Sequence, residues 1–592
     1  MAADNIDDLI EASLSRTQGI EKKLWSSELN GQGRYPLPNP LPQAGEGVLE
    51  QYYAAFQEME NLIALKGNDQ RHAFIIVIPV ADRPQHLQSC LASLLHLCTT
   101  FGYGGYADNR FQKVSVIIAD DSRDNDNIIK NKSIADECNK QGLITRYFGL
   151  DEQLELMDTM SKAERKALFR ILGNLSREAF YHKGSSIMRN IAYLELNKIK
   201  SANEKILFYF IDSDQEFRIK VSTAAGDKNI YACNYLYYLD QIFSRTNASI
   251  LTGKVVGDPP VSPSVMAGNF LEDVICFLHR IAEYDPSLPC QFHGTHKQDN
   301  NEASYHDMAA LFGFKPGSES YQYHCSIKGE HHNARCFNHF SNKLSRFFYG
   351  EHPTRKTYYG HEDMLASIRP ARTIYTGNYV FKPEALKYFI PFAPLKLRMA
   401  GPVLGRLIQS EINNQFVSAN LPMLHKRTVR ETGKSEFRPG ITSNTATIDL
   451  SREFERQFYG DVMLFSIEKL IAMGYPQQTL SDELIAGTLE ETHASILHQY
   501  SCNRLIIFDK INLLKTLFND HKNWWNQFHE YAEAANNFRL FIDNIEHNFG
   551  NQSVGYELIN SATNKAKRHT EVIESIACYA KDRLFWVETL AN

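Results

Sequence analysis

Continuous apolar runs alternate with stretches of helical periodicity between about residues 71 and 257. The runs at 72–80, 113–121, 143–149 and 206–211 are rich in β-branched and aromatic residues, which is typical of strands buried on both faces. Between them, the stretches at 84–98 and 184–199 repeat their apolar residues at helical spacing. Strands that alternate with helices predict an α/β fold with a mostly parallel sheet.

The pattern changes on both sides of this region. Residues 1–30 and 48–66 are helix-like, and Gly31–Gly47 is a Pro/Gly-rich linker. We therefore predict an N-terminal helical arm and linker over 1–70 and an α/β core over 71–440. The core is interrupted by an irregular, His-rich insert at about 258–370. From about 445 to 592 the spacing is amphipathic and helical, which predicts a C-terminal α-helical domain.

Three apolar strands of the predicted core end in polar residues. The first ends at Pro79–Arg83, the second at Asp120–Asp121 and the third at Asp212–Asp214. In open parallel sheets, ligands bind outside the carboxyl ends of the strands. We expect these three strand ends to meet at one site.

Asp212-Ser213-Asp214 is open to two interpretations. Asp-x-Asp after a buried strand can hold a hard divalent cation such as Mg²⁺ or Mn²⁺, which neutralises the charge of a departing diphosphate. The same residues also favour an Asx turn or a helix N-cap. The neighbouring polar strand ends favour the metal. His425, which ends a later strand-like stretch, is a reasonable third ligand for Mn²⁺.

Two further segments carry groups suited to a nucleotide. An aspartate after the second strand can accept hydrogen bonds from a base or ribose, although a solvated acidic loop is an equal alternative. Lys183 and Gly184 open a predicted helix that also carries Arg189. A helix N-terminus with a nearby lysine suits phosphate. Taken alone, the segment is better explained by plain capping by Ser185.

The insert contains a segment, 323–340, that is rich in His and Cys. Its candidate zinc ligands are His324, Cys325, His331, His332, Cys336 and His339. Their spacing fits no zinc-finger pattern, so surface polar residues in an insert are the favoured interpretation.

Composition and charge narrow the class of protein. The chain has 592 residues, of which 43% are hydrophobic and 22% charged, and its net charge of -6 gives no indication of a nucleic-acid partner. The ten cysteines form no dense framework, which is typical of reduced thiols in a cytoplasmic protein. We see no signal peptide and no apolar run long enough to span a bilayer. Peripheral membrane contact and a homodimer formed through the helical tail stay open.

Six segments, taken in order, resemble the GT-A type of nucleotide-sugar glycosyltransferases. They are VIPVADRP (77–84), IIADDS (117–122), KGSSIMRN (183–190), FIDSD (210–214), TGNYVFKPEAL (376–386) and LHKR (424–427). The order is similar to that in the family 2-like group that includes glucosyl-3-phosphoglycerate synthases and mannosylglycerate synthases. The resemblance covers roughly residues 72–430 and implies a GT-A (Rossmann-like) core.

The resemblance also implies an activity and a set of roles. A hexose would pass from a UDP- or GDP-sugar to an unidentified hydroxyl acceptor, with Mg²⁺ or Mn²⁺ bound by Asp212, Asp214 and His425. The residues implied in nucleotide-sugar binding are Pro79, Arg83, Asp121, Lys183, Arg189, Asp212, Gly377 and Asn378.

The sequence departs from the family pattern at the catalytic base. Inverting members carry a Glu-Asp pair at the head of the helix after the Gly-Asn segment, where this chain has AGPVLGRL (400–407). The nearest Glu-Asp pair, Glu362-Asp363, precedes that segment. Either this pair serves as the base or no enzymatic base is used, and the second option favours a retaining transferase. The alternatives from other classes are a nucleotidyltransferase that forms sugar nucleotides and a non-catalytic scaffold that acts through the helical tail.

Overall fold

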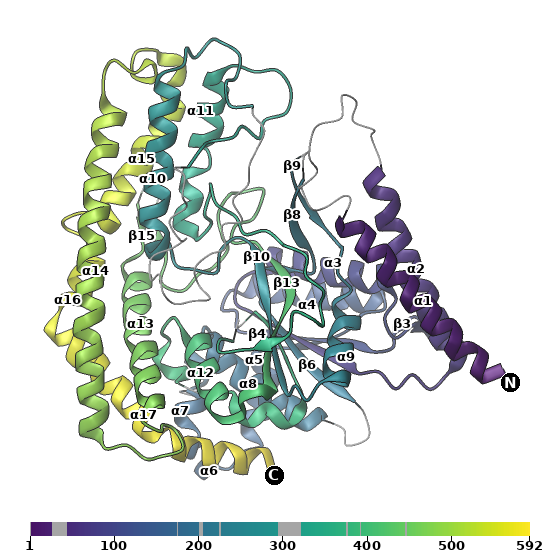
Figure 1. Cartoon of the computed structure of the whole chain (residues 1–592). Coiled ribbons are helices and arrows are strands. Elements are labelled where there is room, and N and C mark those ends of the chain that lie inside the picture. Colours follow the sequence, from purple (N-terminus) through teal and green to yellow (C-terminus); the bar gives the residue numbers. More distant parts are fainter. Residues whose placement is uncertain are drawn as a thin grey trace.

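A computed structural model describes residues 2–26, 44–173, 176–200, 205–223, 226–293, 321–374, 377–390, 392–444 and 447–591. Within these residues a nine-stranded sheet stands between helical layers, as Figure 1 shows. The predicted α/β class with a mostly parallel sheet and many helices is confirmed. Most of the predicted linker, residues 31–43, lies outside the described residues.

The sheet is mixed, and its parallel pairs form two groups. Its order is β11 (Arg369–Pro370), β13 (Phe416–His425), β10 (Ile250–Gly257), β12 (Asn378–Phe381), β6 (Ile206–Ile211), β1 (Ala73–Val80), β4 (Val114–Asp120) and β5 (Ile144–Phe148), with β7 (Gln215–Glu216) paired to β13. The pairs β5–β4, β4–β1, β1–β6 and β10–β13 are parallel. β12 runs antiparallel to both of its neighbours, β6 and β10.

The strand order places a topological switch point between β1 and β6. In chain order, β5, β4, β1 and β6 form the 3-2-1-4 arrangement of doubly wound nucleotide-binding sheets. After β1 the chain passes to β4 on one side, and after β5 it returns to β6 on the other side of β1. A crevice therefore forms where β1 and β6 end. The end of β1 and the end of β6 are two of the three polar strand ends predicted from the sequence.

Alternate residues of the central strands face two separate cores. On one face Ile76, Ile78 and Tyr209 pack against α3 (Pro84–Phe101) and α9 (Tyr235–Arg245). On the other face Phe208 and Phe210 pack against α8 (Ser185–Ile199) and against helices from the C-terminal part of the chain. Successive side chains of a strand point to opposite faces of the sheet, so one apolar strand contributes to both cores.

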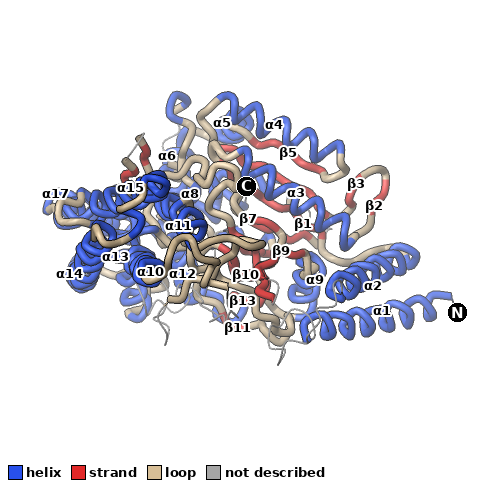
Figure 2. The backbone as a smooth tube through the Cα atoms, turned by 90° about the horizontal axis from the view of Figure 1, so that it is seen from above, coloured by secondary structure: helices blue, strands red, loops and turns tan. Residues whose placement is uncertain are grey.

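The N-terminal helices join the first of these cores. α1 (Ala2–Leu24) and α2 (Ala44–Lys66) lie side by side at the edge of the molecule opposite the C-terminal helices (Figures 1 and 2). Tyr52 and Phe56 of α2 are buried, and the Phe56 ring meets Phe101 edge-on. Trp25 stacks on His361. The arm is therefore packed onto the core.

The segment predicted as an irregular insert contains two helices. α10 (Pro263–Ala282) and α11 (Asn333–Ser341) lie within it, so the expectation of irregular structure over 258–370 was wrong in part. α10 is buried along most of its length. A helix covered on several sides loses the polar face that makes helical periodicity visible.

The C-terminal helices continue the core on the second face of the sheet. They are α13 (Ser451–Ala472), α14 (Asp482–Asn519), α15 (Ala532–Phe549), α16 (Val554–Asn560) and α17 (Ala562–Ala591). α17 returns to the sheet layer, where Trp586 is buried and its indole N–H donates to the Leu386 carbonyl at 3.1 Å. Asp582 also accepts from Arg170 at 2.9 Å. One apolar core therefore spans sheet and tail.

The remaining elements are short or connect the main layers. They are α4 (Asn125–Lys140), α5 (Leu150–Asp158), α6 (Lys162–Ala167), α7 (Phe169–Leu172), α12 (Ala400–Ile412), and the strand pairs β2 (Tyr106–Ala107) with β3 (Arg110–Phe111), β8 (Ile219–Thr223) with β9 (Gly226–Ile230), and β14 (Thr442–Ser443) with β15 (Ile448–Asp449). None of the described helices combines the length and the apolarity needed to cross a membrane.

Two helical glycines test how closely the tail packs on the rest of the chain. A Cβ atom on Gly460 of α13 would stand 2.5 Å from the carbonyl oxygen of Arg398, whereas one on exposed Gly487 of α14 would meet nothing within 4 Å. Gly460→Ala is expected to destabilise the protein by about 1–3 kcal/mol through overpacking. Gly487→Ala should stabilise it by about 0.5–1 kcal/mol through helix propensity. Denaturant unfolding measures both, and equal effects would contradict the close contact.

Candidate functional site

Asp214 lies just beyond the end of β6, beside two arginines and a histidine. Its Oδ2 atom is 3.3 Å from Nη1 of Arg83, 3.6 Å from Nε2 of His425 and 3.7 Å from Nη1 of Arg427. Its side chain is only 6% exposed. Burial alone raises the pKa of a carboxyl, but His425, Arg83 and Arg427 together hold the pKa of Asp214 well below its usual range. Asp214 is therefore a buried carboxylate.

The short strand β7 brings His425 to this carboxylate. Gln215 and Glu216, which follow Asp214 directly, pair antiparallel with His425 and Leu424 of β13. The Lys426 backbone N–H also donates to the Asp214 carbonyl at 2.9 Å. Residues 214 and 425 are thus joined by sheet pairing, although about 210 positions separate them in the sequence.

The imidazole of His425 has a defined orientation. Its Nδ1 lies 2.7 Å from the Asp258 carbonyl oxygen, to which it donates, and its Nε2 faces Asp214. A backbone acceptor on one ring nitrogen commonly prepares the other nitrogen for a metal. The same Asp258 also accepts the Arg427 backbone N–H through its carboxylate, at 2.7 Å.

Asp212 is the more exposed member of the pair. Its side chain is 33% exposed, and its Oδ1 accepts from Nη2 of buried Arg189, on α8, at 2.5 Å. Its Oδ2 lies against Gly377, where a Cβ atom would come within 2.8 Å of it. The predicted residues Arg189, Asp212 and Gly377 are therefore close together.

Asp121 and Lys183 form a buried ion pair at the neighbouring strand end. Lys183 Nζ donates to Asp121 Oδ1 at 2.6 Å, and the Gly184 backbone N–H donates to Oδ2 at 3.3 Å. Burial lowers the pKa of Lys183, and the Asp121 carboxylate opposes that shift. The ammonium group thus orients Asp121. Pro79, opposite Ala119 in the β1–β4 ladder, lies at the same edge of the sheet.

Asn378 has a structural set of partners. It is fully buried, accepts from the Tyr209 hydroxyl at 2.9 Å, and donates to the carbonyls of Lys254 and Leu421 at 2.9 and 3.0 Å. These carbonyls flank the register shift in the β10–β13 ladder. Its side chain therefore supports the sheet beside Gly377.

Glu362 and Asp363 lie on the side of the N-terminal helices. Glu362 is exposed and pairs with Arg369 at 3.3 Å, and Asp363 Oδ1 accepts the Ala366 backbone N–H at 2.8 Å. Arg369 stands opposite Ser418 in β13. Ser418 is seven residues from His425, which is roughly 23 Å along a strand. Among the described residues, no hydrogen bond or ion pair joins this Glu-Asp pair to Asp214.

Sequence reasoning missed two arginines beside this site, the partly buried Arg398 and the buried Arg438. Arg398 pairs with Glu453 at 2.9 Å, and Arg438 donates to the Tyr349 carbonyl. Burial and the neighbouring Arg427, Arg83 and Arg398 guanidinium groups hold the pKa of Arg438 well below its usual range. Neither arginine follows a strand, so only the tertiary contacts reveal them.

Three buried polar atoms at this site have no hydrogen-bond partner among the described residues. They are Nε of Arg189, Oε1 of Gln215 and Nε of Arg427. Buried polar groups are nearly always paired, so an unpaired group needs an explanation. A bound anion or metal would supply partners at this position.

The donor set of the site fits a divalent cation. The carboxylates of Asp212 and Asp214 offer oxygen ligands, and His425 offers an oriented imidazole nitrogen. The fit is one of chemical type, because the ligand atoms of these three described residues do not all lie within 4.8 Å of one another. Oxygen ligands suit Mg²⁺, and an added imidazole favours Mn²⁺.

Comparisons with protein-family models and with curated proteins find no match for this chain. The functional argument therefore rests on the geometry of the site.

The buried pair of Lys183 and Asp121 predicts a specific stability pattern. Lys183→Met should destabilise the protein by about 3–5 kcal/mol, because it leaves a buried carboxylate unpaired. Adding Asp121→Asn should restore much of that loss. In the exposed pair of Glu362 and Arg369, Arg369→Met should cost less than about 1 kcal/mol. Urea unfolding of these three variants and of the unaltered chain tests this, and no recovery in the double variant would contradict the pairing.

Proposed function

We propose that this chain is a metal-dependent glycosyltransferase with a GT-A arrangement, which moves a hexose from a UDP- or GDP-sugar to a hydroxyl acceptor. The observation that carries the proposal is the Asp-x-Asp at the carboxyl end of β6. There Asp214 lies within 3.6 Å of His425 and 3.3 Å of Arg83, at the switch point of the sheet.

The charge around the site suits a nucleotide diphosphate. Arg83 and Arg427 lie beside Asp214, and burial and neighbouring guanidinium groups hold the pKa of Arg438 low. Asp258 and Glu453 offset part of this positive charge. Diphosphate oxygens would relieve repulsion among the guanidinium groups and accept their hydrogen bonds. Asp121, fixed by Lys183 at the edge where β4 ends, is suited to accept from the nucleoside.

Asp212, Asp214 and His425 would hold the cation. A bound Mg²⁺ or Mn²⁺ would neutralise negative charge on the leaving diphosphate. The protein's own part is to fix these ligands: β7 pairing fixes His425, and the guanidinium of Arg189 fixes one oxygen of Asp212.

A retaining reaction fits the position of the carboxylates. Glu362 and Asp363 have local partners, and Glu362 pairs with an arginine opposite the start of β13. In a retaining transfer the leaving diphosphate itself can accept the acceptor's proton, so neither carboxylate is needed as a base. This supports the absence of an enzymatic base over a relocated one.

Asp214→Asn tests the metal site without changing side-chain size. We expect metal-dependent hydrolysis of the donor sugar to fall roughly 100-fold or more, since charge stabilisation at the leaving group is lost. The assay uses a panel of UDP- and GDP-sugars with Mn²⁺. His425→Gln should lower activity in the same direction.

The matched control is Asp509→Asn on the exposed face of α14, which should keep full activity. Thermal shift of the unaltered chain with each nucleotide sugar, with and without Mn²⁺, reports binding independently of turnover. Full hydrolysis by Asp214→Asn would overturn the mechanism. Absence of stabilisation by any nucleotide would favour the scaffold alternative.

The stereochemical course is tested by Glu362→Gln and Asp363→Asn. If the reaction is retaining, both variants should keep the activity of the unaltered chain, because neither side chain takes a proton. NMR detection of the first anomer released from the donor should show the donor's own configuration. Loss of activity in either variant together with an inverted anomer would contradict a retaining course.

A further inference from the structure

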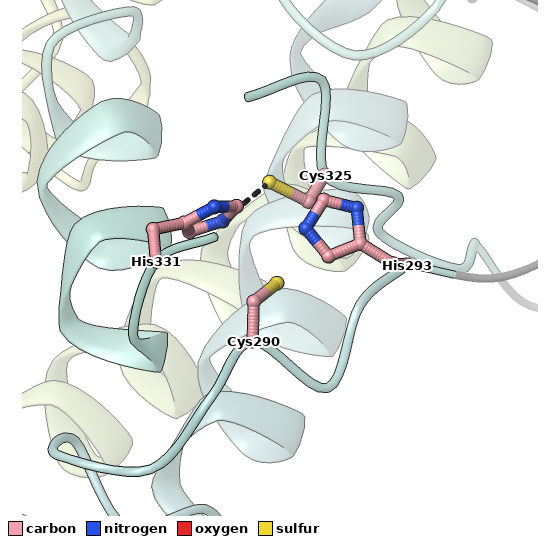
Figure 3. Close-up of side chains that lie close together, drawn as sticks. All are labelled: Cys290, His293, Cys325 and His331. Atoms are coloured by element: carbon pink, nitrogen blue, oxygen red, sulfur yellow. Dashed lines mark hydrogen bonds between the residues drawn. The ribbon is translucent and has the colours of Figure 1, made fainter. Parts of the chain in front are cut away.

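A second group of metal-ligating side chains lies outside the proposed active site. Cys290 and His293 follow α10, Cys325 and His331 precede α11, and Cys336 lies on α11. The ligand atoms of the first four all lie within 4.8 Å of one another, and Figure 3 shows these side chains gathered in one place.

Cys336 joins this group through three short distances. Its Sγ atom lies 3.3 Å from Sγ of Cys290, 3.5 Å from Sγ of Cys325 and 3.4 Å from Nε2 of His331. Cys325 Sγ is 3.2 Å from the same nitrogen. Tetrahedral zinc with Zn–S bonds near 2.3 Å spaces its ligand atoms about 3.7 Å apart. The four atoms therefore surround a space of the right size for one ion.

Backbone groups around the cluster prepare the ligands for a cation. The backbone N–H two residues after each cysteine donates to its sulfur, from Phe292 to Cys290 at 3.4 Å and from Ile327 to Cys325 at 3.3 Å. Such bonds stabilise a thiolate. These partners are the outer shell expected of a structural metal site.

The histidine has a matching outer-shell partner. Nδ1 of His331 is 2.8 Å from the Gly329 carbonyl oxygen, to which it donates, so its Nε2 lone pair faces the sulfur atoms of Cys325 and Cys336. Orientation of this kind is typical of a zinc-binding imidazole.

We propose that Cys290, Cys325, His331 and Cys336 bind one structural Zn²⁺ ion. Three thiolates and one imidazole in a closed tetrahedron are an established type of structural zinc site. Soft sulfur ligands select zinc over Mg²⁺ or Mn²⁺, which prefer oxygen. The cluster is partly to fully buried at these four residues, so the interpretation of the segment 323–340 as surface polar residues was wrong for Cys325, His331 and Cys336.

The fourth ligand is Cys336 and not His293. Cys336 is fully buried and contacts all three of the other ligands. His293 is exposed, and its ring meets that of His331 edge-on with centroids 4.9 Å apart. His293 therefore covers the outer side of the site.

The zinc would fasten the turn after α10 to α11. The Cys290 backbone N–H already donates to the His331 carbonyl at 2.8 Å, and Asn333 donates to the Asp285 carbonyl at 2.9 Å. α11 in turn packs into the helical tail, where Phe337 stacks on Trp525. The site thus links the insert to the C-terminal helices.

The zinc site is separate from the proposed active site. α10 begins five residues after Asp258 and ends before the turn that carries Cys290. Its 20 residues span about 30 Å. The inference therefore does not depend on the proposed function.

The test is the metal content of the full chain. After expression with zinc in the medium, elemental analysis should find about one zinc per chain. Cys290→Ser, Cys325→Ser and Cys336→Ser should each lose most of it. His293→Ala should keep it, as should the control Cys502→Ser, which changes an exposed cysteine of α14.

Cobalt provides a measurement that needs no variant. The Co²⁺-exchanged chain should show the intense visible bands of a tetrahedral site and a near-ultraviolet thiolate charge-transfer band. Chelation should lower the melting temperature and expose residues 285–293 and 321–341 to protease. An unaltered chain free of zinc, and unable to bind Co²⁺ at this site, would overturn the proposal. Loss of zinc in His293→Ala with retention in Cys336→Ser would overturn the assignment of Cys336.

Discussion

The site is organised around one buried charge, the carboxylate of Asp214. A carboxylate removed from water is tolerated only when cations and hydrogen bonds replace its hydration. Its partners come from the turn after β1 and from the end of β13. The environment of Asp214 therefore depends on three features together: the start of α3 at Arg83, the β7–β13 pairing and the switch point of the sheet.

The same constraint applies to the other carboxylates at the edge of the sheet. Asp212 is held by Arg189, and Asp121 by Lys183. Each pairing fixes an acidic side chain at a strand end without flexible surface contacts. Fixed groups of this kind would lower the cost of organising the polyanionic ligand and metal that we propose for this site.

Away from the sheet, stability depends on continuity between the insert and the tail. The tail helices share one apolar core with Phe208 and Phe210 of β6, and α10 and α11 extend that core outward. The Cys/His cluster lies where the polypeptide turns between these two helices. A metal there would reinforce a junction that backbone hydrogen bonds, such as that from Cys290 to His331, already join.

The sequence by itself determined the elements and their polar ends. Long runs of β-branched and aromatic residues predicted β1, β4 and β6, because a strand buried on both faces carries apolar residues without polar ones in between. The aspartates and the arginine at the strand ends could also be located from the sequence, because they come directly after the apolar runs. By contrast, Arg398, Arg438 and the Cys290 ligand carry no local signal, and α10 was hidden because it is buried on most sides.

Only the tertiary structure decided which side chains meet. Lys183 faces Asp121, Asn378 supports the sheet, and Glu362 lies with Arg369. These outcomes depend on strand register and on contacts between separate elements, as between Asp121 and Lys183, 62 positions apart. Periodicity records whether a residue is buried, but the identity of its partner is set by how separate elements pack.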